Sequence, residues 1–313
     1  MKKCIALVSV FALNLFAAQD FHLIPLGVRG GSDESNLSSY LISDSQEEHY
    51  LSLDAGTLYS GIKFYLNKIN ASEDPTSFLQ HKIKGYYISH PHFDHSSGLI
   101  INSPEDFANK KIYGPKITID AFKNHVFIWD TWANFGNEGE QPILNKFKYQ
   151  TLDFNTDIPI DGTVLSMKTF PLSHVGEEKS SAVLVKNSKS AYFLYLGDTG
   201  ADRIENSGAI ENLWNTIEPL ILKKQLKGIA IECSYANAQP NDKLFGHLKP
   251  ELLIEEVLKL EKKVGEENLK NVTFIITHIK YKKGIEEQII KEIEPLTKKY
   301  KFVIAQQGEM IVL

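Results

Sequence analysis

At 313 residues, with 42% hydrophobic and 23% charged residues, the chain has the composition of a globular enzyme and room for one large α/β domain or two small ones. Its formal net charge of −5 argues against a surface that binds nucleic acid polymers. An anionic substrate would therefore need a local source of positive charge, such as bound metal ions.

The N-terminus has the pattern of a secretory signal. A short basic segment, Lys2-Lys3, precedes an apolar run from Cys4 to Ala18. The run is too short to span a bilayer and ends in small residues, which favours cleavage after Ala17 or Ala18. Residues 1–18 are therefore predicted to be a cleavable signal peptide; a buried strand or a membrane anchor are the alternatives. Cleavage would leave Cys233 as the only cysteine, so no disulfide could form within one chain.

Short β-like runs predominate in the next part of the chain. Strands are predicted over residues 22–27, 38–42 and 50–53, and the spacing of apolar residues predicts a helix over 61–70. Gly30-Gly31 follows the first strand, where glycine allows the chain to turn with positive φ.

The densest cluster of chemically active residues follows the β-prone run 86–88. His90, His92, Asp94 and His95 lie within six residues. In an extended chain His90, His92 and Asp94 would point one way, while His95 could turn to a neighbouring position. The loop would thus supply two adjacent ligand sets, and imidazole and carboxylate at this density suit zinc or another borderline divalent ion. An exposed polar loop is the alternative, which four ligand-type residues so close together disfavour.

The pattern His90-x-His92-x-Asp94-His95 resembles the metal signature of the metallo-β-lactamase superfamily. The longer stretch from His90 to Ile100 resembles the class II cyclic-nucleotide phosphodiesterases, with Phe93 where that family typically has leucine. Because bacterial members carry such leaders, the resemblance implies a periplasmic protein. Asp54 follows the strand over 50–53. It would either support the metal ligands through hydrogen bonds, without binding the metal itself, or cap the turn in which it lies.

An aromatic-rich segment, residues 118–135, is predicted to be a helix or a helical loop. Its aromatic side chains would form core or, alternatively, a wall on which a nucleobase stacks. We leave His125 outside the candidate site, because it has no ligand partner nearby in the sequence. The segment carries Phe122, His125, Phe127, Trp129, Trp132 and Phe135.

Four later apolar strands each deliver one metal-competent side chain near their C-terminal end. They run over residues 166–174, 191–200, 228–234 and 272–278, and the side chains are His174, Asp198, Glu232 and His278. Ligands gather where several strands end at one edge of a sheet, a common place for α/β active sites. Helical spacing recurs over 253–260 and 285–293, and no linker divides the chain.

These patterns predict one catalytic domain over residues 19–313, of the α/β class (α+β by some schemes). Two sheets, each covered outside by helices, would form a four-layer αββα sandwich, which is the metallo-β-lactamase fold. The resemblance implies two divalent metal ions, with zinc expected. It assigns His90, His92 and His174 to one ion, and Asp94, His95 and His278 to the other. Asp198 would bridge the two.

Hydrolysis also requires a proton for the leaving oxygen. The candidate donor is His247, with Glu232 as the carboxylate that orients it, and Asp94 is expected to take part in catalysis. A histidine that caps the helix starting at Pro250 is the alternative.

The expected function is that of a periplasmic 3′,5′-cyclic-nucleotide phosphodiesterase. It would hydrolyse cyclic AMP, and cyclic GMP as a further candidate, to the 5′-nucleotide through a hydroxide held by two metals. The alternatives are an aryl sulfatase, a general phosphodiesterase, an RNase Z-like nuclease, or a non-catalytic zinc- or nucleotide-binding protein. The expected partner is a small cyclic nucleotide, with no nucleic acid polymer and no membrane span after signal cleavage. A homodimer is left open.

Overall fold

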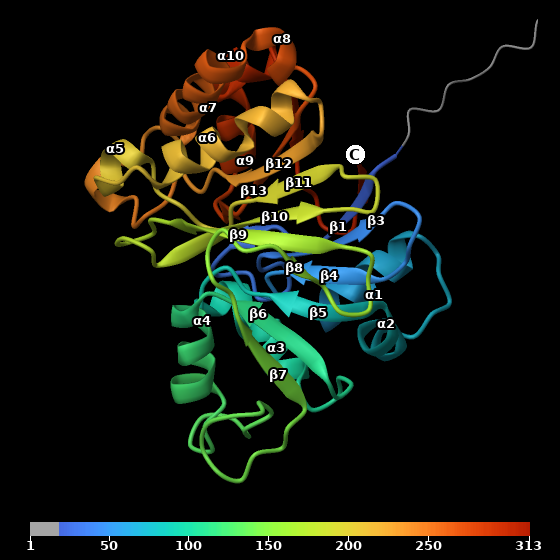
Figure 1. The fold of residues 1–313 in the computed structure, drawn as a ribbon. Coiled ribbons are helices and arrows are strands. Elements are labelled where there is room, and N and C mark those ends of the chain that lie inside the picture. The colour runs from blue at the N-terminus through green and yellow to red at the C-terminus, as the bar shows by residue number, and fades with distance from the viewer. Residues whose placement is uncertain (1–18) are drawn as a thin grey trace, which may run out of the picture.

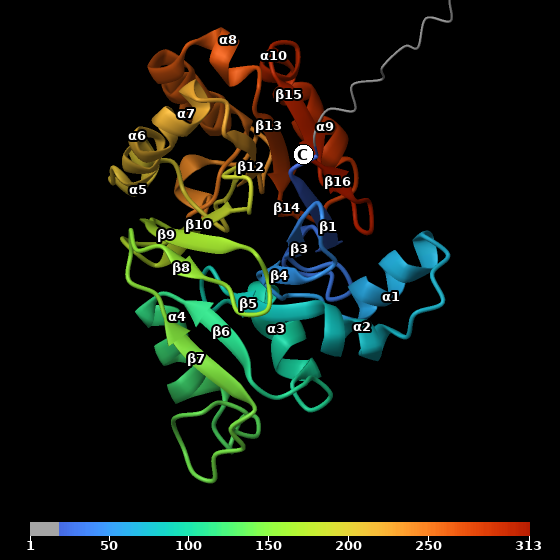
Figure 2. The same ribbon diagram turned by 45° about the vertical axis from the view of Figure 1, so that its right-hand side comes forward.

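The computed structural model describes residues 19–313, and the predicted signal peptide lies outside them. The strands of these residues form two seven-stranded sheets and one two-stranded sheet. The two large sheets face each other, and helices cover the outer side of each (Figures 1 and 2). This αββα layering confirms the fold class expected from the sequence.

The first sheet contains most strands of the N-terminal half. Its order is β16 (Ile311–Val312), β1 (Phe21–Gly27), β3 (Ser39–Asp44), β4 (Tyr50–Leu53), β5 (Ile83–Tyr87), β6 (Lys110–Gly114) and β7 (Phe147–Thr151). The pairs from β4 to β7 are parallel and the others antiparallel. The helices associated with this half are α1 (Tyr59–Lys68), α2 (Pro75–Lys82), α3 (Phe93–Asn102) and α4 (Lys116–Ala121).

The second sheet belongs to the C-terminal half. Its order is β15 (Lys301–Ile304), β13 (Thr273–Thr277), β12 (Leu226–Glu232), β11 (Tyr192–Tyr195), β10 (Ser180–Lys186), β9 (Ser166–Leu172) and β8 (Ile158–Pro159). The helices of this half are α5 (Asp202–Glu205), α6 (Ala209–Leu222), α7 (Pro250–Val264), α8 (Glu266–Leu269), α9 (Ile285–Glu292) and α10 (Glu294–Thr297). A small parallel pair joins β2 (Arg29–Gly30) to β14 (Ile279–Lys280), near the two ends of the chain.

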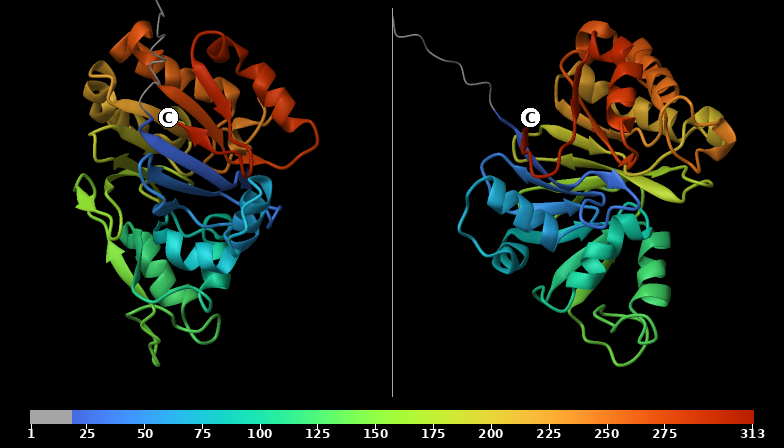
Figure 3. Two further views of the ribbon diagram at one scale, coloured as in Figure 1. Left: turned by 90° about the vertical axis from the view of Figure 1, so that its right-hand side faces the viewer. Right: turned by 180° about the vertical axis from the view of Figure 1, so that it is seen from behind.

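The core forms three layers that follow from the alternation of side chains along each strand. On β12, Ala230 lies in the layer between the two sheets, whereas Ile229 and Ile231 pack under the outer helices. On β13, Ile275 faces the other sheet in the same way. Both faces of these strands are buried, which explains why the sequence shows continuous apolar runs there. The two ends of the described chain also meet, because Leu313 O accepts hydrogen bonds from residues 20 and 21 (Figure 3).

The signature stretch differs from the expected extended chain. Helix α3 begins at Phe93 with His92 as its N-cap, so Asp94 and His95 lie in its first turn. Gly98 permits the helix to pack in this place, because a Cβ there would lie 2.7 Å from the carbonyl oxygen of Ala55. The alternation predicted for His90, His92 and Asp94 was therefore wrong.

The aromatic segment is divided between core and surface. Helix α4 continues into a π-helical turn over Phe122–Val126, and an irregular loop then leads to β7. Phe122 and Phe127 are fully buried, whereas Trp129 and Trp132 are 42% and 36% exposed. Trp132 Nε1 donates a hydrogen bond to Ser103, the residue that caps the C-terminal end of α3. A ten-residue helix is about 15 Å long, so Trp132 lies a full helix away from the histidines at the other end of α3.

Within residues 19–313, no helix combines the length and the apolar character that crossing a membrane requires.

Candidate metal centre

The predicted ligands converge at one rim of the sandwich. The turn after β5 and the start of α3 carry the first four, and the segments after β9, β11 and β13 carry the others. Five sets of three ligand atoms lie within 4.8 Å of one another among the described residues. Three of them contain the predicted ligands alone: His90, His92 and His174; Asp94, His95 and His278; and His90, His95 and Asp198. The other two contain His247: His174, Asp198 and His247; and Glu232, His247 and His278. The structure thus brings together all seven residues that the sequence singles out as metal ligands.

Asp198 occupies the middle of this cluster. Its Oδ2 lies 3.1 Å from His95 Nε2, 3.3 Å from His278 Nε2, and 3.7 Å and 4.0 Å from the Nε2 atoms of His90 and His174. The Asp198 side chain is 1% exposed. One carboxylate is thereby shared between the set around His90 and the set around His278.

Asp54 fixes the orientation of two of these imidazoles. Its carboxylate lies 2.7 Å from His95 Nδ1, and it accepts hydrogen bonds from the Ser89 hydroxyl and the Tyr195 hydroxyl. Because the Ser89 hydroxyl donates to Asp54, it can accept from His90 Nδ1, which lies 3.0 Å away. Both imidazoles therefore direct Nε2 inward, which is the usual effect of a carboxylate behind a metal-binding histidine. Asp54 supports the ligands, as one of its two sequence interpretations proposed.

The histidines of the second sheet are oriented in the same way. His174 Nδ1 lies 2.8 Å from the carbonyl oxygen of Gly246, which accepts its proton. His278 Nδ1 lies 2.9 Å from the Ser234 hydroxyl, which itself donates to Glu232. Sequence patterns alone assign no role to Ser89, Ser234 or Tyr195. The one signal for the two serines is that each lies near the end of a strand that leads to candidate site residues.

The chemistry of the ligand side chains fits a divalent cation. Among the described residues, Asp198 Oδ1 is buried and has no hydrogen-bond partner, and His95 Nε2 lies 3.1 Å from Asp198 Oδ2 without the geometry of a hydrogen bond. Such an unpaired buried atom costs about 1–3 kcal/mol, which a bound cation would offset. Imidazole nitrogens and carboxylate oxygens at this spacing are the ligands that zinc and similar ions take. The residues therefore fit a divalent metal.

The protonation states support this fit. Burial, together with the neighbouring His95, holds the pKa of His90 well below its usual range. Burial also lowers the pKa of His92 and of His174. These three imidazoles are therefore neutral, the form that binds a metal ion.

The carboxylate at the centre is ionised. Burial opposes ionisation of Asp198, but the charges of His278, His95 and His247 outweigh it and place its pKa well below the usual range. Burial likewise opposes protonation of His95, yet Asp198 and Asp54 raise the pKa of His95 well above its ordinary value. His95 Nε2 thus attracts positive charge, whether from a proton or from a metal ion.

His247 and Glu232 form a buried pair beside the cluster. His247 Nδ1 lies 2.8 Å from Glu232 Oε1, and the His247 ring centroid is 4.8 Å from that of His174. Burial opposes the charged form of His247, but Glu232 and Asp198 raise its pKa. Helix α7 has Lys249 as its N-cap, so the alternative of a capping histidine at His247 is wrong.

Close backbone contacts and strained residues surround the site. A Cβ on Gly30 would lie 2.2 Å from His278 Cε1, so only glycine fits there. Asp54, Val175, Phe245 and His278 all have φ between 51° and 56°. This left-handed conformation is costly for non-glycine residues, above all for a β-branched valine, and such strain clusters at functional sites.

Comparison with solved structures defines the class of protein. Unliganded yeast PDE1 matches with a TM-score of 0.82 at 22% identity, over 95% of this chain and 100% of that one. The short form of human tRNase Z matches with a TM-score of 0.53 at 18% identity, over 93% and 98%. The metallo-β-lactamase fold protein YhfI from Bacillus subtilis matches with a TM-score of 0.62 at 15% identity, over 95% and 100%. The chain thus has a metallo-β-lactamase fold with a histidine–aspartate metal cluster.

Comparison with sequences then gives the family. The model of the class-II cAMP phosphodiesterases matches residues 17–307. A 3′,5′-cyclic-nucleotide phosphodiesterase of Aliivibrio fischeri is 37% identical, over 97% of this chain and 96% of that protein. Its counterpart in Schizosaccharomyces pombe is 30% identical over 92% of both chains. The chain belongs to the class-II cyclic-nucleotide phosphodiesterase family, as the signature indicated.

Asp54→Asn is expected to lower metal affinity about 10- to 100-fold, because the amide replaces the charge that orients His95. The measurement is the metal content after dialysis against a graded series of chelator concentrations. Asp44→Asn is the matched control, since Asp44 is also buried but bonds to Ser188 away from the cluster. Equal metal retention in the two variants would contradict the role of Asp54.

Proposed function

We propose that this protein hydrolyses 3′,5′-cyclic nucleotides, cyclic AMP above all, to the 5′-nucleotide with two divalent metal ions. The observation that carries the proposal is the pair of ligand sets around one shared buried carboxylate, Asp198. Membership in the class-II family supports the choice of substrate.

Each ligand set would hold one ion. His90, His92 and His174 would hold the first; Asp94, His95 and His278 would hold the second; Asp198 would touch both. Zinc is the proposed metal, because the set is rich in imidazole and has few oxygen ligands. When bound, such ions supply Lewis acidity toward water and toward the phosphate oxygens.

The chain itself supplies the proton for the leaving group. Opening the cyclic ester between phosphorus and O3′ adds water to phosphorus and leaves O3′ in need of a proton. His247 donates Nδ1–H to Glu232, which leaves Nε2 on the other edge of the ring to carry that proton. Glu232 is held in turn by Thr199 N and the Ser234 hydroxyl, so the imidazole keeps one orientation. Glu232 is a positioning residue, and His247 is the proposed general acid.

The direct test is incubation of the purified protein with cyclic AMP and chromatographic identification of the product. We expect 5′-AMP, loss of turnover with a chelator, recovery on adding metal, and about two metal ions per chain. Cyclic GMP, an aryl sulfate, a chromogenic phosphodiester and a tRNA precursor complete the panel. Binding of cyclic AMP without product, or turnover of the aryl sulfate alone, would overturn the proposal.

His247→Ala should keep both metals but lose kcat toward cyclic AMP by about 10²- to 10⁴-fold, because the leaving oxygen has no proton donor. The loss should be smallest for p-nitrophenyl diesters, whose acidic leaving groups need no proton. His49→Ala is the control, since His49 is an exposed histidine in the turn before β4. An unchanged kcat toward cyclic AMP would exclude the assigned role.

The proposed location is the periplasm. The basic start and short apolar run of residues 1–18 favour export and cleavage. In its native cells, we expect the protein in the periplasmic fraction, with a mature N-terminus at residue 18 or 19 by mass spectrometry. An uncleaved chain in the cytosolic fraction would refute this placement.

A further inference from the structure

A cavity of about 420 Å³ adjoins the metal centre. Three segments line it: residues 30–32 after β2, residues 234–239 after β12, and residues 280–288 from β14 into α9. They come from the beginning, middle and end of the chain, and the β2–β14 pair forms one wall. The volume lies within the usual range of pockets for small ligands.

The cavity shares a wall with the metal centre. Ser234 lines the cavity, and its hydroxyl lies 2.9 Å from His278 Nδ1. Gly30 also lines it and packs against the His278 ring. Lys280 is paired with Gly30 in the β2–β14 register and follows His278 by two residues. This wall lies on the Nδ1 side of His278, and Tyr235, which lines the cavity 6.0 Å from the His247 ring, marks the side from which a ligand at the metal centre would reach it.

Positive charge and an aromatic ring lie at the end nearest the metal centre. Lys280 Nζ lies over the Tyr235 ring, 5.8 Å from its centroid, and the Tyr235 ring lies 6.0 Å from that of His247. In the part of the chain that the structure describes, neither Lys280 nor Lys282 has a carboxylate within ion-pair distance. Unpaired ammonium groups beside a half-buried ring suit an anionic ligand with a flat ring system.

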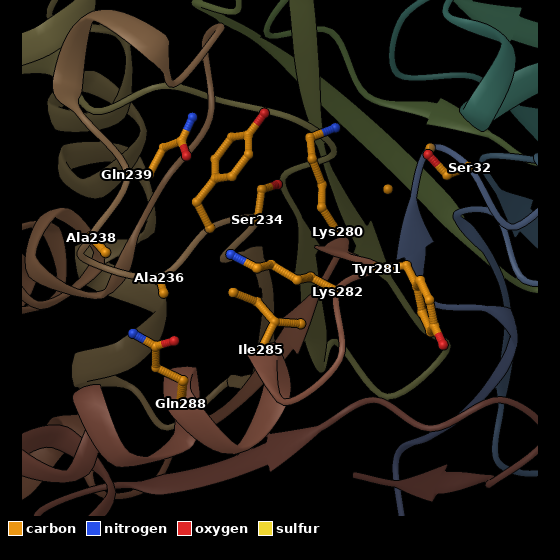
Figure 4. Close-up of a pocket in the computed structure, with 13 residues that line it drawn as sticks. Ser32, Ser234, Ala236, Ala238, Gln239, Lys280, Tyr281, Lys282, Ile285 and Gln288 are labelled. Carbon is orange, nitrogen blue, oxygen red and sulfur yellow. The ribbon is translucent and has the colours of Figure 1, made fainter.

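Two amide side chains lie at other edges of the cavity. Figure 4 shows Ser234 and Lys280 on one side, and Ile285 and Gln288 on the opposite side. Gln239 Nε2 donates to the carbonyl oxygen of Lys243, and Gln288 Nε2 donates to Glu292. Each amide oxygen therefore remains available to accept a hydrogen bond from an amino group.

We propose that this cavity binds the nucleoside half of the cyclic nucleotide and contributes to substrate specificity. Lys280 would contact the phosphate, Tyr235 would pack against the sugar and base, and the oxygens of Gln239 and Gln288 would accept from the exocyclic amino group of a purine. The inference rests on the proposed function. In it, these residues recognise the sugar and the base of the substrate in addition to its phosphate.

A competing place for the base is the exposed apolar rim formed by Phe93, Val175 and Phe245. Phe93 and Val175 adjoin cluster residues in sequence, Phe245 precedes His247 by two residues, and each is 63–65% exposed. These side chains carry no hydrogen-bonding groups, so they would bind any base without discrimination between amino and carbonyl substituents. The cavity offers both stacking and hydrogen bonds, and we therefore place the base there.

The experiment compares inhibition of cyclic AMP hydrolysis by 5′-AMP and by ribose 5-phosphate, which share a phosphate and a sugar but differ in the base. Tyr235→Ala should raise the inhibition constant of 5′-AMP about tenfold or more and change that of ribose 5-phosphate less than about twofold. Tyr235→Phe should keep the wild-type values. Gln288→Ala, at an exposed helical position, should raise the constant for 5′-AMP alone by a few fold.

Lys280→Met should weaken both inhibitors, because they share the phosphate. Lys283→Met is the matched control: Lys283 is exposed in the same loop but does not line the cavity, and this variant should match wild type. Circular dichroism and metal content verify that each variant is folded and loaded.

The outcomes separate this inference from the proposed function. If wild type hydrolyses cyclic AMP but Tyr235→Ala and Gln288→Ala leave the preference for 5′-AMP unchanged, the cavity does not bind the base. If Phe245→Ala alone removes that preference, the base lies on the rim instead. If wild type neither turns over cyclic AMP nor is inhibited by 5′-AMP, the proposed function itself fails.

Discussion

A buried carboxylate among imidazoles is the constraint on which the site depends. Moving an ionised carboxylate out of water costs several kcal/mol unless positive charge or hydrogen bonds replace the lost hydration. Asp198 is almost fully buried, and five imidazole nitrogens lie 3.1–4.0 Å from its Oδ2. Those of His90 and His174 are held neutral by burial. The buried carboxylate therefore requires positive charge beside it. This requirement is why the histidine and aspartate side chains form a candidate metal centre.

The same contacts that orient the ligands also hold the two sheets together. Asp54 follows β4 of the first sheet, yet it accepts a 2.6 Å hydrogen bond from Tyr195 on β11 of the second. Ser181 on β10 donates to the carbonyl oxygen of Ser89, next to His90. Metal binding to this framework should therefore stabilise the folded state, because the unfolded chain has no comparable site.

The metal cluster alone does not select the substrate. The human tRNase Z shares this fold, so the fold by itself does not define the substrate. Specificity must come from the walls around the cluster, where the His247–Glu232 pair lies and where we propose that the cavity beside Ser234 binds the nucleoside. Glu232 ends β12 and His247 lies in the segment after it, whereas the cavity is lined by residues 30–32, 234–239 and 280–288.

The sequence by itself determined the features that depend on local periodicity. Apolar runs that end in a polar residue located His174, Asp198 and His278, and the apolar spacing located α1 and α9, because each pattern records which face of an element is buried. Only the tertiary structure decided the helical start of the signature at Phe93 and the Nδ1 partners such as Asp54 and Ser234. It also decided the pairing of Gly30 with Lys280. These features depend on contacts between residues far apart in the chain, which no local pattern encodes.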